Sequence, residues 1–284
     1  MQTPFSPSTS RPRPLIVLGA GYTGRWLYQL RRLNSEPVFV TSRSPLAHLD
    51  YADPADRLAF NLQEPGGWAA LPSDADILWC FPAEPVEAIH ALASHSTLTN
   101  RRVVVLGSTS AYHVAPPASS PPTWVDETAP LDMSRARVQG EEYLRTRCGA
   151  IVLRVAGIYG PGRNPLDWIR QGRVGRVAKY VNLIHVHDLA SVCLAALEQG
   201  MTGEAYNVSD GTPRTWESIC REAADRWAVA PRPGIPDAGP GKRIATSKMR
   251  QAFAVTLRYP NLFHALEELE GLRSPSPPPE HRRG

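Results

Sequence analysis

The stretch PLIVLGAGYTGRWL, residues 14–27, decides the fold of this chain. Four apolar residues, 15–18, run directly into a Gly-x-Gly-x-x-Gly pattern, and the apolar residues beyond it recur at helical spacing. This combination predicts a buried parallel strand that turns tightly into a helix. Gly19 would form the turn, Gly21 would let a ligand approach the backbone, and Gly24 would let the helix pack closely on the strand.

A helix that starts at such a turn presents its first free N–H groups, here at Tyr22 and Thr23, and the positive end of its dipole. Both features favour an anion, so the pattern predicts a site for the pyrophosphate of a dinucleotide. Glycine-rich turns are common, and the alternative is a strand–turn–helix with a purely structural role. The strand before the glycines and the helix after them favour the dinucleotide.

The end of the second predicted strand, residues 37–43, indicates which dinucleotide fits. A chain that prefers NAD carries an acidic residue about 20 residues beyond the glycines, where it binds the ribose hydroxyls. Ser42 and Arg43 stand here instead. An arginine at this place suits a 2′-phosphate, so we expect NADP to be favoured over NAD. The alternative is that Arg43 is an exposed loop residue.

Further apolar runs alternate with helical patterns along the chain. Strands are expected at residues 57–62, 75–83, 102–107, 151–155 and 205–208, and helices at residues 86–93 and 132–147. Another helix is expected to begin within residues 182–190, with His187 or Asp188 near its cap. Strands that alternate with helices predict an α/β protein with a doubly wound parallel sheet. Residues 215–271 are expected to be helical and loop-rich.

The composition is that of a globular protein. The 284 residues are 42% hydrophobic and 20% charged, with a formal net charge of +4. No apolar run is long enough to span a membrane, and the arginines form no basic stripe, so neither a membrane nor a nucleic acid is expected as a partner. The four cysteines contain no Cys-x-x-Cys pair and are expected to be free thiols in the cytoplasm.

Both ends of the chain are expected to be disordered tails, residues 1–13 and 272–284. The first of them is rich in Ser, Thr, Pro and Arg and lacks acids, and the alternative for it is a remnant of an organelle-targeting segment. His185 and His187 form a His-x-His pair, but no third ligand stands near them in the sequence. No metal site is therefore predicted.

Several motifs, taken in order, resemble one family. They are Gly19-x-Gly21-x-x-Gly24, STSAY at 108–112, RVAGIYGPG at 154–162, IHVHDLA at 184–190 and YNVSDG at 206–211. Together they resemble the extended short-chain dehydrogenase/reductase family, in its NAD-dependent epimerase/dehydratase group. This resemblance implies a Rossmann domain around the dinucleotide, and a smaller C-terminal, substrate-side subdomain over a substrate that is commonly a nucleotide sugar. The first would comprise residues 14–158 plus about 181–209, and the second residues 159–180 plus 210–271.

The same resemblance assigns roles to individual residues. Phe81, Pro82 and Ala83 would line the cofactor, and Ser108 matches the catalytic serine or threonine of the family. Active members carry Tyr-x-x-x-Lys on the helix after the proline-rich loop. Aligned on the small residue and the glutamate that follow, this chain has Met133 at the tyrosine position and Arg137 at the lysine position.

These two replacements leave two functions open. A thioether has no titratable proton, so Met133 cannot act as a general acid or base. Arg137 keeps a positive charge that could hold the cofactor ribose, but it does not deprotonate. The combination resembles atypical family members.

One hypothesis is an NAD(P)-dependent oxidoreductase or epimerase that acts on an unknown small molecule through Ser108 and Arg137. The other is a dinucleotide-binding regulatory or scaffold protein without turnover; a homodimer is compatible with either.

Overall fold

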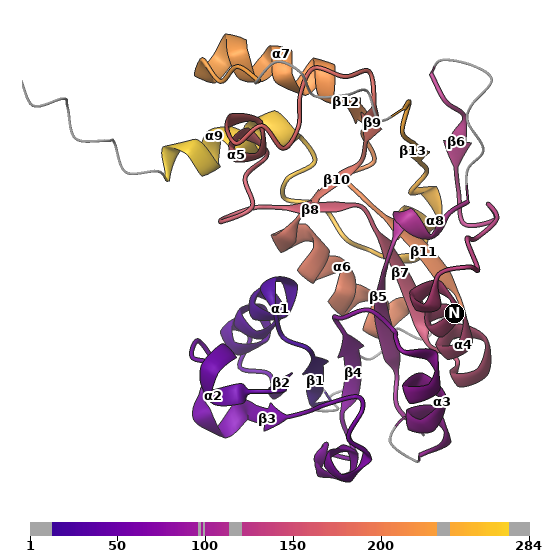
Figure 1. Ribbon diagram of the computed structural model, residues 1–284. Helices are drawn as coiled ribbons and strands as arrows, with labels where there is room; N and C mark the ends of the chain where they lie inside the picture. Colours follow the sequence, from indigo (N-terminus) through magenta and orange to yellow (C-terminus); the bar gives the residue numbers. More distant parts are fainter. Residues whose placement is uncertain (1–12, 96–97, 99, 114–120, 232–238, 273–284) are drawn as a thin grey trace, which may run out of the picture.

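The computed structural model describes residues 13–95, 98, 100–113, 121–231 and 239–272. Its centre is a seven-stranded sheet in which every neighbouring pair of strands is parallel (Figure 1). The strands of this sheet are β1 (Leu15–Leu18), β2 (Val38–Ser42), β3 (Arg57–Ala59), β4 (Asp76–Trp79), β5 (Val103–Ser108), β7 (Ile151–Val155) and β11 (Ala205–Val208).

The strand order is β11-β7-β5-β4-β1-β2-β3, so the chain first builds outward from β1 and then returns to build from its other side. The order reverses between β1 and β4, whose residues Leu15 and Leu18 pair with Asp76 and Trp79. A reversal of this kind opens a crevice at the carboxyl ends of the strands, where open α/β sheets bind their ligands. The expected doubly wound Rossmann sheet is confirmed.

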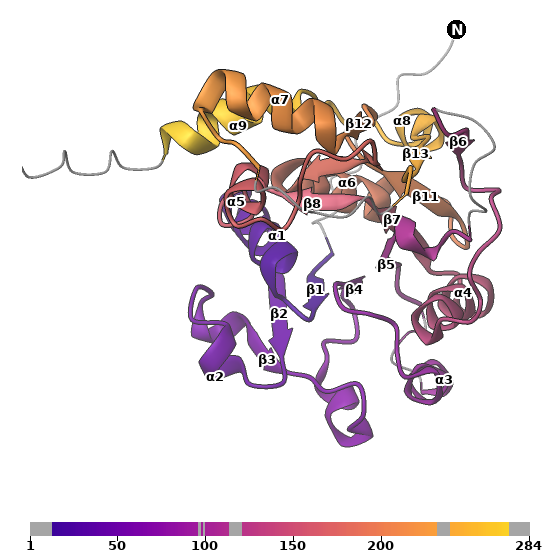
Figure 2. The ribbon, with the colours of Figure 1, turned by 45° about the horizontal axis from the view of Figure 1, so that its top comes forward.

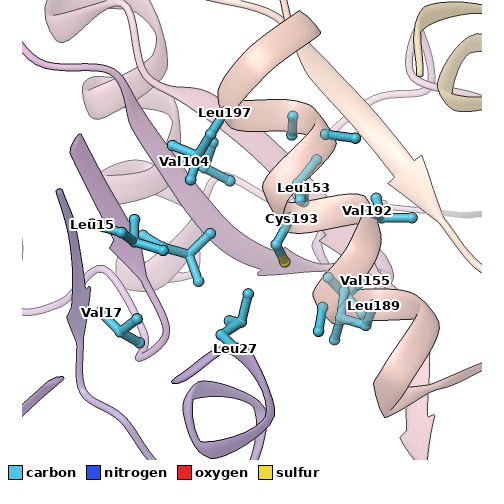
Figure 3. Close-up of a cluster of buried hydrophobic side chains, with 14 of the residues drawn as sticks. Leu15, Val17, Leu27, Val104, Leu153, Val155, Leu189, Val192, Cys193 and Leu197 are labelled. Carbon is cyan, nitrogen blue, oxygen red and sulfur yellow. The ribbon is translucent and has the colours of Figure 1, made fainter. Parts of the chain in front are cut away.

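Helices cover both faces of the sheet because its strands are apolar on both sides. In β1, Leu15 and Val17 point to the face that is covered by α1 (Tyr22–Leu33) and α6 (Val186–Gln199). Figure 3 shows these side chains packed against those of both helices, with Val104 of β5 and Leu153 of β7 in the same cluster.

The alternate residues of β1, Ile16 and Leu18, point to the opposite face. There they join a cluster with residues of α3 (Val86–Ser94) and α4 (Ala136–Cys148). Each fully buried aliphatic side chain contributes roughly 1.5–3 kcal/mol, so these two clusters stabilise the sheet whose strand ends form the crevice.

The C-terminal part of the chain forms a third apolar cluster. It joins α5 (Pro165–Arg170), α7 (Trp216–Trp227) and α9 (Leu262–Gly271), which lie together in Figures 1 and 2. The remaining helices are α2 (Pro45–His48) and α8 (Ser247–Ala252). Three two-stranded sheets pair β8 (Gly157–Tyr159) with β10 (Leu183–His185), β9 (Tyr180–Val181) with β12 (Arg214–Thr215), and β6 (Trp124–Val125) with β13 (Arg243–Ile244).

Three of the expected boundaries are wrong by three residues or more. The expected strands 57–62 and 75–83 end at Ala59 and Trp79, because the chain turns away from the sheet there to line the crevice. The helix expected from residue 132 begins at Ala136. The helix within residues 182–190 is capped by His185, whose Nδ1 accepts a hydrogen bond from the His187 N–H, and Asp188 lies in its first turn. The expected tails lie outside the described residues, except residues 13 and 272.

Candidate functional site

The glycine turn after β1 has the geometry that the sequence predicts. Gly19 has a φ of +74°, which disfavours residues with a side chain, and its N–H donates to Thr41 Oγ1 of β2 at 3.0 Å. A Cβ atom at Gly19 would also lie only 2.5 Å from Phe81. The turn therefore requires glycine both for its conformation and for its contact with the segment after β4.

Gly21 and Gly24 differ in what surrounds them. A Cβ atom at Gly24 would lie 3.0 Å from both Ala20 and Val17, so this glycine permits the close packing of α1 on β1. A Cβ atom at Gly21 would meet nothing within 4 Å, because this residue faces open space. The second glycine thus leaves room for a ligand, while the third is needed for packing.

Two cavities meet at this turn. The first measures about 600 Å³ and lies beside the carboxyl end of β2, where Ser42 and Arg43 line it. His48 of α2 also lines this cavity, with its Nδ1 3.1 Å from Ser42 Oγ. On the opposite side, beyond β4, the cavity has one acidic lining residue, Glu84. Its size is typical of a site for a small molecule or cofactor.

The second cavity measures about 220 Å³ and extends from the glycine turn across the ends of β4, β5 and β7. Gly19, Gly21 and Phe81 line both cavities, so the two spaces adjoin. The second is also lined by the first residues of α1 and by two arginines that reach it from different directions. The expected cofactor-binding residues on it are Gly19, Gly21, Tyr22, Thr23, Gly24, Phe81, Pro82 and Arg137.

Ser108 and Ala83 line neither cavity. Ala83 is buried against α4, where a Cβ atom at Gly140 would overlap the Ala83 carbonyl oxygen. Ser108 lies at the end of β5, and its hydroxyl group donates to Ser110 Oγ at 3.1 Å. Arg137 Nη2 donates to the same Ser110 oxygen at 3.3 Å. The structure thus connects the two expected catalytic residues through Ser110, which the sequence analysis did not select.

Arg137 is held from behind by a buried carboxyl group. Its Nε lies 3.1 Å from Oε1 of Glu141, one helical turn further along α4. The Glu141 side chain is only 2% exposed, and its Oε1 accepts no hydrogen bond from the described residues. Burial raises the pKa of Glu141 to about 7, although the charges of Arg137 and Arg154 oppose that rise.

Met133 lies three residues before α4 and is half exposed, so it does not share a helical face with Arg137. Neither of two tyrosines nearer the strand ends takes the place of the missing one. The Tyr112 hydroxyl donates to Asn207 Oδ1 at 2.6 Å and accepts from Arg154 at 3.1 Å in a buried network. Tyr159 is fully buried in the C-terminal cluster.

Two residues of the candidate site had no predicted role. His48 lines the first cavity, and Arg163 lines the second. Arg163 directly follows the RVAGIYGPG motif at 154–162, and this position next to a glycine-rich turn could have indicated it. His48 lies on a helix of only four residues and had no such signal. Within the described part of the chain, no group of three or more His, Cys, Asp or Glu residues is placed to hold a metal ion.

All four cysteines are free, with Cys193 and Cys220 buried and Cys80 and Cys148 partly buried. No helix among the described residues has the length and apolar character needed to cross a membrane.

The strand order, the glycine turn and the crevice define a Rossmann-type α/β protein. Its fold is that of the NAD-dependent epimerase/dehydratase and short-chain dehydrogenase/reductase proteins, to which several solved structures of closely similar shape belong. No model of a known protein family matches the sequence, and neither does the sequence of any curated protein.

Three solved structures illustrate the similarity. A conserved protein of unknown function from Silicibacter pomeroyi is 26% identical, with a TM-score of 0.72 over 92% of this chain and 99% of that one. A Methylobacillus flagellatus protein that bears the name NAD-dependent epimerase/dehydratase is 24% identical, with a TM-score of 0.72 over 92% and 98%. The Bordetella bronchiseptica enzyme WbmG, solved with NAD and UDP, is 14% identical, with a TM-score of 0.73 over 94% and 96%.

Proposed function

We propose that this chain binds a nicotinamide dinucleotide across the two adjoining cavities, with NADP preferred. One observation carries the proposal: the Gly19–Gly24 turn opens on both cavities at the point where the strand order reverses. The open space beside Gly21 leaves room for a pyrophosphate at the start of α1, where the helix dipole favours an anion. A nicotinamide, when bound, would supply hydride transfer.

The preference for NADP rests on the first cavity. Ser42, Arg43 and His48 would surround the adenosine ribose and supply a cation and polar hydrogens to a 2′-phosphate. Glu84, the acidic residue that lines this cavity, stands beyond β4 rather than at the end of β2. It is therefore not at the position from which a carboxylate selects NAD.

The proposed activity is an oxidoreductase or epimerase reaction on a small, nucleotide-sugar-like substrate, without the usual tyrosine and lysine. Ser108 would donate a hydrogen bond to a substrate oxygen after its hydroxyl group turns away from Ser110 Oγ. Arg137 would stabilise negative charge next to it through the shared Ser110. The substrate class is suggested by the family resemblance and by the UDP bound to WbmG.

A second candidate is a protein that binds the dinucleotide without turnover. Two observations favour it. Met133 is half exposed and carries no titratable proton, and Arg137 is held by Glu141. Positioned acid–base groups contribute about 10²–10⁴-fold to a rate, so their loss leaves binding possible while turnover becomes slow.

Calorimetric titration with NADP⁺ and NAD⁺ tests the proposal. We expect the native protein to bind both and Gly21→Val to bind neither, because the new side chain would occupy the space beside the turn. Gly66→Val is the matched control, since a Cβ atom there also meets nothing within 4 Å and Gly66 lines neither cavity. Undiminished binding by Gly21→Val would show that the assignment is wrong. Native mass spectrometry of the purified protein would identify any nucleotide or small molecule that co-purifies with it.

A further inference from the structure

Arg163 reaches the second cavity from the loop between β8 and α5. Its guanidinium group lies 4.3 Å from the centre of the Tyr22 ring, and Tyr22 is the first residue of α1. The two side chains therefore bridge the cavity between the glycine turn and the loop that follows β8.

Backbone hydrogen bonds hold this loop, residues 160–163, against the start of α1. Tyr22 Oη donates to the Pro161 carbonyl oxygen at 2.9 Å. The Gly160 and Arg163 backbones exchange hydrogen bonds of 3.3 and 2.9 Å, which closes a tight turn. Gly160 has a φ of +147°, and a Cβ atom there would lie 2.9 Å from Tyr22 Oη. Glycine is therefore required for the tyrosine to reach the loop.

The next residue anchors the turn to the C-terminal cluster. Asn164 caps α5 by accepting a hydrogen bond from the Leu166 N–H at 2.9 Å. Its amide also donates to Glu270 Oε1 at 2.7 Å. The position of Arg163 is thus fixed on one side by Tyr22 and on the other by Asn164.

The charge of Arg163 distinguishes it from the other arginine in this cavity. Arg137 forms an ion pair with Glu141, whereas no carboxylate of the described residues forms an ion pair with Arg163. Stacking on a tyrosine ring orients a guanidinium group but leaves its charge available. The first N–H groups of α1 face the same cavity, so cation and helix terminus together favour an anion there.

We propose that Arg163, which lines the same cavity as the glycine turn, binds the diphosphate of the dinucleotide, and that Tyr22 positions it. This inference rests on the proposed function, since it names a residue that holds the same ligand. The diphosphate would lie between the start of α1 and the guanidinium group. An arginine hydrogen-bonds phosphate oxygens in a planar, two-pronged geometry that a lysine does not reproduce.

The test compares ligands that contain and lack a diphosphate. Arg163→Ala should weaken the binding of NADP⁺ and ADP-ribose about ten- to hundredfold, the effect of one lost charge-assisted contact. It should leave the binding of adenosine 2′-monophosphate within about twofold, because that probe reaches only the first cavity. The affinity of the native protein for NADP⁺ should also fall more steeply with salt than that of the variant.

Two further variants distinguish an effect of the Arg163 charge from an effect of a changed fold. Arg25→Ala removes an exposed arginine of α1 that also stacks on a tyrosine ring, at 5.0 Å, but lines neither cavity; its affinities should match those of the native protein. Tyr22→Phe keeps the ring under Arg163 and loses the hydrogen bond to Pro161. It should show a several-fold loss for NADP⁺, together with the native salt dependence, because the charge remains.

The outcomes are distinct. If Arg163→Ala binds NADP⁺ as tightly as the native protein, the inference is wrong while the proposed function stands. An equal loss for adenosine 2′-monophosphate also contradicts it, because the effect would then not concern the diphosphate. If the native protein binds no dinucleotide, both the proposed function and this inference fail.

Discussion

The carboxyl group of Glu141 is buried between the backbone of Gly107 and the guanidinium group of Arg137. A Cβ atom at Gly107 would lie 2.6 Å from Glu141 Oε2, and Arg137 Nε lies 3.1 Å from Oε1. Gly107 and Arg137 both line the second cavity, so this carboxyl group lies directly behind its wall. Because burial raises the pKa of Glu141, the stability of the fold depends on pH through this group.

Glu141 should lower the free energy of unfolding as the pH rises from about 4.5 to about 7. In this range the unfolded chain releases the Glu141 proton, whereas burial holds the pKa of the folded chain at about 7. The folded state therefore binds more protons, and stability decreases with pH by roughly 2–4 kcal/mol from this group. Glu141→Gln imitates the protonated carboxyl group and should remove that decrease.

Denaturant unfolding at pH 5 and pH 8 measures this effect as the difference between native protein and variant. Asp210, whose pKa is also raised by burial, contributes in the same direction in both proteins. His185, whose pKa is lowered by burial to about 4, contributes in the opposite direction in both, so only the difference between the two proteins is informative. Glu217→Gln replaces an exposed carboxylate on α7 and should keep the native pH dependence. If Glu141→Gln also keeps the native pH dependence, the Glu141 carboxyl group ionises like an exposed glutamate and the prediction is wrong.

Gly24→Val should destabilise the fold, in contrast to Gly21→Val. Even one carbon atom at Gly24 would lie 3.0 Å from Ala20 and Val17, and two further methyl groups must be accommodated between α1 and β1. Overpacking of this kind costs about 1–3 kcal/mol. Thermal unfolding should show a fall of several degrees for Gly24→Val. Equal melting temperatures for the native protein and Gly24→Val would contradict the packing role of this glycine.

Arg43→Ala should weaken NADP⁺ binding about ten- to hundredfold, because it removes a charge-assisted contact to the 2′-phosphate. Binding of NAD⁺ serves as the internal control, since NAD⁺ lacks that phosphate and its affinity should change little. Parallel calorimetric titrations of the two cofactors measure both effects. Equal affinities of the native protein for NADP⁺ and NAD⁺ would remove the basis for the preference.

The sheet could be predicted in detail because its strands are buried on both faces. Residues 151–155 and 205–208 are apolar except for Arg154 and Asn207, and the structure has strands with the same bounds. The glycine turn could be predicted because it needs particular residues at fixed spacing. These features depend on local sequence, so the sequence alone identifies them.

The surroundings of the site depend on contacts between distant segments and could not be predicted. The start of α4 is displaced to Ala136 because residues 131–133 run beside the turn after β5, where the Asp132 N–H donates to the Ala111 carbonyl oxygen at 2.8 Å. Likewise, Arg163 and Tyr22 are 141 residues apart in sequence numbering (163 − 22) and meet only in the folded chain. Aligned motifs locate equivalent positions but not such contacts.

The last prediction concerns the missing tyrosine and lysine. In the native protein, hydride transfer that relies on a tyrosine should be absent or very slow, because Met133 has no proton to donate. Met133 lies on the segment beside the Ser108–Ser110 turn rather than on α4, so a tyrosine there would approach that turn from the side. Met133 is 48% exposed, and a larger side chain can therefore be accommodated without a change in the core.

The double variant Met133→Tyr with Arg137→Lys should therefore gain redox activity on a suitable carbonyl compound, up to about 10²–10⁴-fold, the usual contribution of a positioned acid–base group. Oxidation of NADPH, followed by absorbance over a panel of carbonyl compounds, measures it. Met133→Phe with Arg137→Lys is the matched control, since it adds the ring without the hydroxyl group and should gain nothing. If the native protein already turns over rapidly and Ser108→Ala leaves that rate unchanged, the chemistry uses other residues. If all forms bind NADP⁺ tightly and none reduces any compound, the result supports the binding protein without turnover.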